Sequence, residues 1–88
     1  MQENTLKVRE NFIKARAQLD AVGYINLMRE KSPDSLSQMM GGVLVINMIE
    51  GEKIIREAID FLNLNGNPVG IHFYIDSLAK AVLDRIKN

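Results

Sequence analysis

The sequence predicts an all-α fold, a small bundle of about four helices. Apolar residues recur at helical spacing in the first third of the chain and again near its C-terminus, and a Ser-Pro pair separates the first helix from the next segment. The expected helices cover residues 5–30, 33–49, 51–64 and 68–87. A chain of 88 residues is expected to form a single helical domain over residues 1–88.

The first expected helix carries two apolar stripes. One stripe has 4-3-4-3 spacing and consists of Val8, Phe12, Ala15, Leu19 and Val22. The second stripe lies on another side of the helix and consists of Leu6, Ile13, Ala17, Tyr24 and Met28. Two apolar stripes need two partners, so this helix is expected to contact either two neighbours in a bundle or one neighbour and a second copy of the chain.

Two Xaa-Pro pairs mark expected helix starts. Ser32 precedes Pro33 and is predicted to cap the second helix, because serine hydroxyls accept bonds from the first free backbone N–H groups. Replacing Ser32 with alanine is predicted to cost about 1 kcal/mol. Asn67 and Pro68 can begin the last helix in the same way.

Two segments also read as β-strands, which leaves a second fold open. Gly41 and Gly42 disfavour a helix by roughly 2 kcal/mol, and residues 43–49 are rich in β-branched side chains. Residues 69–75 show a similar strand pattern. The alternative is an α+β fold of order α-β-α-β-α with parallel strands at 43–49 and 69–75. Two parallel strands alone make a poor sheet, so the bundle is favoured.

The composition argues against several classes of partner. Eleven basic and eleven acidic residues cancel, so the chain lacks the positive field that drives binding to nucleic acids or anionic lipids. The absence of cysteine excludes disulfides and thiolate metal sites. The longest apolar stretch, 41–48, is far shorter than the roughly 20 residues of a membrane helix, and the N-terminus lacks a signal-peptide core. We therefore expect a cytoplasmic protein without a membrane association.

His72 is the only histidine and the best candidate for chemistry. On a helix it shares a face with Asp76 and Lys80, and a His–carboxylate pair can act as a general base. A metal needs three or four ligands, and only two suitable side chains are present at this position. We expect His72 to be structural, with no metal, no cofactor and no enzymatic activity. An enzyme of unknown type around His72 and Asp76 is the third functional hypothesis.

Methionine and glycine in the middle of the chain indicate an adaptable surface, because methionine adjusts its shape to irregular partners. The apolar faces also exceed what a small monomer can easily hide. The candidate interface consists of Ile13, Tyr24, Met28, Met39, Met40 and Val43.

The first functional hypothesis is a small protein–protein interaction module, acting as an adaptor, inhibitor or accessory subunit. It is expected to form a homodimer and to bind a further protein that the sequence does not identify. The alternative is a dimeric nucleic-acid-binding regulator. Its candidate basic patch consists of Lys7, Arg9, Lys14 and Arg16.

Overall fold

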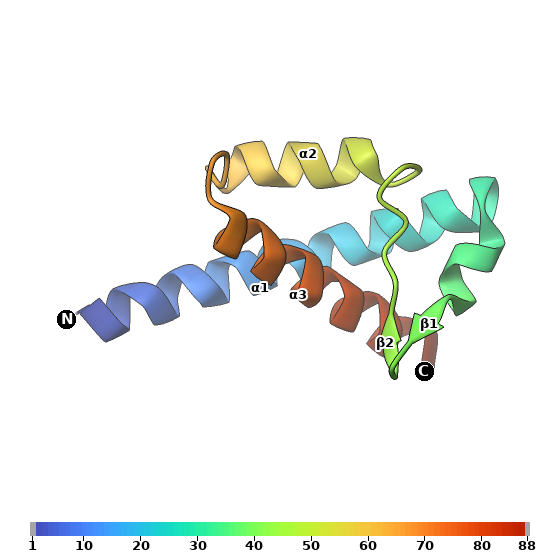
Figure 1. Ribbon diagram of the computed structural model, residues 1–88, viewed down its shortest axis with the longest axis horizontal. Coiled ribbons are helices and arrows are strands. Elements are labelled where there is room, and N and C mark those ends of the chain that lie inside the picture. Colours follow the sequence, from blue (N-terminus) through green and yellow to red (C-terminus); the bar gives the residue numbers. More distant parts are fainter. Residues whose placement is uncertain (1, 88) are drawn as a thin grey trace.

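Three α-helices and a short β-hairpin make up the described part of the chain (Figure 1). The computed structural model describes the backbone of residues 2–87 and the side chains of residues 8–87. In chain order the elements are α1 (Gln2–Lys31), the 3-10 helix η1 (Pro33–Ser37), β1 (Met39–Met40), β2 (Val43–Leu44), α2 (Glu52–Phe61) and α3 (Pro68–Lys87). The chain is mostly helical, as predicted, but the four-helix arrangement is not confirmed.

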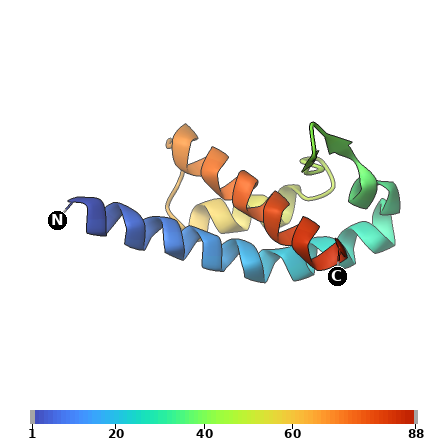
Figure 2. The same cartoon turned by 90° about the horizontal axis from the view of Figure 1, so that it is seen from below.

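The long helix α1 organises the molecule. Helix α2 lies along one side of α1, and α3 crosses α1 at an angle on another side (Figures 1 and 2). The first turns of α1 extend beyond both other helices (Figures 1 and 2). One side of α1 is therefore covered by protein, while another side is left to solvent.

The core lies mainly between α1 and α3. From α1 it takes the second apolar stripe, of which Ile13, Ala17, Tyr24 and Met28 are all buried. From α3 it takes Tyr74, Leu78 and Val82, which are completely buried. Burying one large aliphatic side chain stabilises a fold by roughly 1.5–3 kcal/mol. These contacts therefore fix which side of α1 faces inward.

The predicted helix over 33–49 does not form. After the single 3-10 turn, the chain makes an antiparallel hairpin in which Met39 pairs with Leu44 and Met40 with Val43. Gly41 and Gly42 have φ angles of 60° and 80°. Positive φ at both central residues defines a type I′ turn, whose twist matches that of the two strands. The two glycines that weaken a helix are the residues that this turn requires.

The α-β-α-β-α alternative is wrong as well. Only Val43 and Leu44 of the predicted strand 43–49 are extended in a sheet, and residues 69–75 belong to α3. Helix α3 starts where Asn67-Pro68 predicted it to start, because Asn67 Oδ1 accepts a bond of 3.0 Å from the backbone N–H of Gly70. This bond satisfies one of the free donors at the helix N-terminus.

The predicted capping role of Ser32 is wrong. Its side chain makes no capping bond, and its hydroxyl instead lies 2.9 Å from the hydroxyl of the buried Ser35. The backbone N–H of Ser35 bonds the Ser32 carbonyl at 2.9 Å, which is the i→i+3 pattern of a 3-10 turn. Because the chain forms only this short turn, there is no α-helix at this position for a cap to stabilise.

Asn47 ties the loop between β2 and α2 to the rest of the fold. Its backbone N–H donates to the Tyr24 hydroxyl at 2.8 Å, and its side-chain Nδ2 donates to Ser35 Oγ at 2.9 Å. Its Oδ1 accepts the backbone N–H groups of Ile49 and Glu50 at 3.1 and 2.9 Å. The loop is thereby fixed to α1 through one polar residue.

The hairpin turn gives a first testable prediction. Replacing Gly42 with alanine should lower the free energy of unfolding by about 1–2 kcal/mol, since a Cβ disfavours the left-handed conformation. No atom lies within 4 Å of a Cβ built at this position, so the cost is conformational only. The matched control is Gly41→Asn, which should be nearly neutral because Asn-Gly suits a type I′ turn. Urea unfolding curves measure both, and equal stability of Gly42→Ala and the wild type would contradict the turn assignment.

Candidate functional site

The first apolar stripe of α1, which we call the α1 stripe, faces solvent. It consists of Val8, Phe12, Ala15, Leu19 and Val22. The exposed fractions are 67% for Val8, 56% for Phe12, 74% for Leu19 and 45% for Val22, and Ala15 is also exposed. At about 100° per residue the α1 stripe lies about 180° around the helix from the buried stripe. Helix α1 is therefore apolar on two opposite sides, only one of which its own chain covers.

Phe61, the last residue of α2, widens the α1 stripe at its edge. It is 61% exposed, and its ring is stacked on that of Phe12 with 6.0 Å between centroids and an interplanar angle of 18°. The guanidinium of Arg16 lies over the Phe61 ring, 4.7 Å from its centroid. We call the α1 stripe and Phe61 together the apolar face. It joins two helices and is ordered by a ring stack and a cation–π contact.

A polar network on α1 borders this face. Arg16 Nε bonds both carboxylate oxygens of Asp20, at 3.2 and 3.1 Å, and the buried Tyr74 hydroxyl donates to Asp20 Oδ2. Burial raises the pKa of Tyr74 far above its usual range, and the hydrogen bond and negative charge of Asp20 raise it further. Tyr74 therefore keeps its proton. The network joins α3 to α1 and neutralises Arg16 beside the apolar face.

The structure divides the predicted interface into two groups. Ile13, Tyr24 and Met28 are buried in the core, so they are not on the surface of this chain. Met39, Met40 and Val43 are exposed on the hairpin. The sequence shows two apolar stripes on α1 but not which of them faces α3. The exposed apolar residues of α1 are those of the other stripe, and no signal in the sequence distinguishes it from the buried one.

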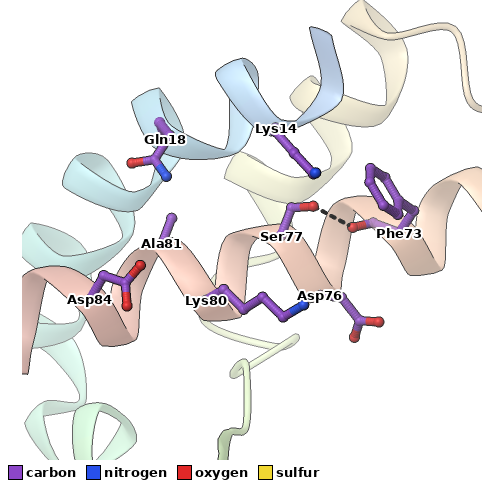
Figure 3. Close-up of a pocket in the computed structure, with 8 residues that line it drawn as sticks. All are labelled: Lys14, Gln18, Phe73, Asp76, Ser77, Lys80, Ala81 and Asp84. Atoms are coloured by element: carbon purple, nitrogen blue, oxygen red, sulfur yellow. Dashed lines mark hydrogen bonds between the residues drawn. The ribbon is translucent and has the colours of Figure 1, made fainter. Parts of the chain in front are cut away.

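A groove of about 330 Å³ runs between α1 and α3. It is lined by Lys14, Gln18, Phe73, Asp76, Ser77, Lys80, Ala81 and Asp84 (Figure 3). The Lys14 ammonium lies 5.8 Å from the centroid of the Phe73 ring. The Ser77 hydroxyl donates to the backbone carbonyl of Phe73 at 2.8 Å, so it is held by its own helix and not by a base (Figure 3). The groove has charges of both signs and does not assemble an activated nucleophile.

The His72–Asp76 pair is present but lies on the surface of α3. His72 Nε2 is 3.4 Å from Asp76 Oδ2, and the two side chains are 80% and 52% exposed. Neither side chain is enclosed in a buried site. Among the side chains that the structure describes, no three of His, Cys, Asp and Glu come together as metal ligands.

The three candidate basic residues whose side chains are described do not form one patch. Arg16 is paired with Asp20, whereas Lys14 faces Phe73 of α3. Arg9 is exposed, and the side chain of Lys7 lies outside the described residues. The positive charges needed for a phosphate backbone are therefore divided between two sides of α1.

The apolar face is the surface feature from which function can be argued. Five of its side chains follow one another along α1, the sixth is Phe61 of α2, and all six are open to solvent. Over residues 2–87, the structure contains no helix that is both long and apolar enough to cross a membrane. Comparisons with known protein families, curated proteins and solved structures gave no match to this chain.

Proposed function

We propose that this protein is a small protein–protein interaction module that forms a homodimer through the apolar face. The observation that carries the proposal is the α1 stripe, with exposed apolar residues at 4-3-4-3 spacing opposite the core. This is the spacing of the a and d positions of a heptad, at which side chains of paired helices interlock. A module of this kind acts by binding, as an adaptor, inhibitor or accessory subunit.

The α1 stripe is long enough for two copies of α1 to pair along it. From Val8 to Val22 the α1 stripe is about 21 Å long, at 1.5 Å per residue. A standard interface buries about 800 Å² on each partner, which is about an eighth of the 6109 Å² that the chain exposes. Phe61 adds an aromatic side chain to the α1 stripe, and aromatic residues contribute strongly to interfaces.

The polar flanks of the α1 stripe favour a second copy as the partner. Asn11 and Gln18 border it on one side and are uncharged. Arg9 and Arg16, one heptad apart, border it on the other side, where Asp20 neutralises the charge of Arg16. Two copies can therefore approach along this face with little like-charge repulsion, which would otherwise disfavour a self-pairing.

The test is a charge placed at the centre of the face. Leu19→Glu should convert a dimer into a folded monomer, because each copy would bury an unpaired carboxylate. Sedimentation equilibrium at tens of micromolar measures the mass against the 9.9 kDa of one chain, and far-UV circular dichroism checks the helical content. Met28 is unsuitable for this test because it is buried in the core.

The matched control is Ile49→Glu, which charges an apolar residue that is 87% exposed and lies outside the apolar face. It should leave the dimer intact. A wild-type protein that sediments only as a monomer would overturn the proposal. A Leu19→Glu variant that remains a dimer would also overturn it, because another surface would then hold the copies together.

A further inference from the structure

The volumes along the α1 stripe distinguish between the two ways in which two copies of α1 can pair. In a parallel dimer each a or d residue meets its own counterpart. Phe12 would then meet Phe12, and one layer later Ala15 would meet Ala15. The thickest layer would lie beside the thinnest, although packed interfaces need nearly uniform spacing between helix axes. A parallel seam would leave a void at Ala15.

An antiparallel dimer removes this mismatch. In this arrangement the two helices run in opposite directions, and each residue at heptad position a packs against a residue at position d of the partner copy. Phe12 then lies against Val22 of the partner copy, and Ala15 lies against Leu19 of the partner copy. Every apolar layer then combines a larger with a smaller side chain, so the leucine fills the space that the alanine leaves. In this register Val8 faces Asn26, which is exposed and continues the heptad pattern after Val22.

Phe61 agrees with the same register. Phe61 lies on the side of α1 that carries Arg16, because the two side chains are in contact. Helix α2 also lies beside Gly23 on this side, since a Cβ built at Gly23 would lie 3.8 Å from Ile54 of α2. Antiparallel pairing brings Phe12, and Phe61 stacked on it, to the level of Val22 and Gly23 of the partner copy. Gly23 is exposed and adds no side chain of its own at that point, so the ring would meet its backbone and the neighbouring Ile54 of the partner copy's α2.

We propose that two copies of the chain pair antiparallel through α1, with Phe12 opposite Val22 and Ala15 opposite Leu19. This inference rests on the proposed function, because it specifies the geometry of the same dimer. The dimer axis crosses the apolar face at the level of residue 17 along each helix, and the projecting N-terminal turns of the two α1 helices point in opposite directions.

Engineered cysteines test the direction directly, because the natural chain contains none. Three variants are compared: Val8→Cys, Asn26→Cys and the double variant that carries both. A disulfide needs Cα atoms within about 7 Å. In the antiparallel dimer the two copies of residue 8 are about 27 Å apart at 1.5 Å per residue, as are the two copies of residue 26, whereas residue 8 faces residue 26.

Oxidised glutathione is added at a protein concentration at which the wild type is a dimer, and covalent dimers are separated on a non-reducing gel. The double variant should be captured at least tenfold faster than either single variant. Adding Leu19→Glu to the double variant should abolish the capture.

The remaining outcomes separate the two proposals. Rapid capture of the single variants would show a parallel dimer and overturn the inference, while the proposed self-association stands. A wild type that is a dimer by sedimentation but yields no capture in any variant would overturn the use of the α1 stripe. A wild type that is a monomer overturns both proposals.

Discussion

Raising the pH from 10 to 12 is expected to unfold this protein in one cooperative transition in which both tyrosines ionise together. Tyr24 and Tyr74 are completely buried. Burial raises the pKa of each hydroxyl in the folded state. For Tyr24 the backbone N–H of Asn47 partly opposes the rise, whereas for Tyr74 the hydrogen bond and charge of Asp20 reinforce it.

The direction of the effect is set by proton linkage. In the unfolded chain tyrosine loses its proton near pH 10, whereas in the folded chain it keeps it. The stabilisation is therefore fully present below pH 10 and is lost as the pH rises toward the folded-state pKa. Each buried tyrosine removes up to about 1.4 kcal/mol per pH unit above pH 10. Tyr74 alone removes up to about 3 kcal/mol by pH 12, and Tyr24 adds to this loss in the same direction. The total is a large share of the free energy of unfolding of a marginal domain.

Absorbance near 295 nm measures the ionisation of the tyrosines, and far-UV circular dichroism measures the loss of helix in the same pH titration. The chain has two tyrosines and no tryptophan, so the absorbance reports only on Tyr24 and Tyr74. The two signals should change together. The Tyr74→Phe variant should unfold with a clearly weaker pH dependence. Ionisation of either tyrosine near pH 10 with the helices intact would contradict the burial of its hydroxyl.

Replacing Tyr24 with alanine is expected to leave most of the protein molecules unfolded at room temperature. The Tyr24 ring packs beside Gly51, where an added Cβ would lie 3.1 Å from the ring, and its hydroxyl accepts the backbone N–H of Asn47 at 2.8 Å. Truncating a buried aromatic side chain costs about 3–5 kcal/mol. The N–H of Asn47 would lose its partner as well, which adds about 1–3 kcal/mol where that group stays buried. The sum is comparable to the whole stability of a small domain.

Two controls separate the contributions in urea unfolding. Tyr24→Phe keeps the ring and loses only the acceptor, so it should cost about 1–2 kcal/mol. Ile49→Ala shortens an exposed apolar side chain and should change the stability by less than about 0.5 kcal/mol. A Tyr24→Ala variant as stable as Tyr24→Phe would show that the ring does not hold α1 against the loop.

The sequence by itself predicts the elements whose signals are local. The long periodic pattern of residues 5–30 predicts α1, and Asn67-Pro68 predicts the start of α3, because the capping bond joins residues only three positions apart. The two apolar stripes on α1 are also visible without a structure. Such signals depend on neighbours along one helix, and these neighbours are known once the residues are known.

Competing local preferences explain the errors at 33–49. A continuous apolar run suits a buried helix and a strand equally well, so periodicity alone does not decide between them. Gly41 and Gly42 resolve the competition by taking positive φ angles in the turn. Ser32 has the residue type of a cap, but its hydroxyl lies near Ser35, which in turn accepts a bond from Asn47.

Tertiary structure alone decided which stripe of α1 became core and which became surface. Both stripes are apolar and differ only in what packs on them. One of the contacts that orient α1 joins Asp20 to Tyr74, 54 residues further along the chain, and no local pattern encodes a contact at that separation. Once α3 covers Ile13, Ala17, Tyr24 and Met28, helical geometry leaves Phe12, Leu19 and their neighbours on the opposite side, facing solvent.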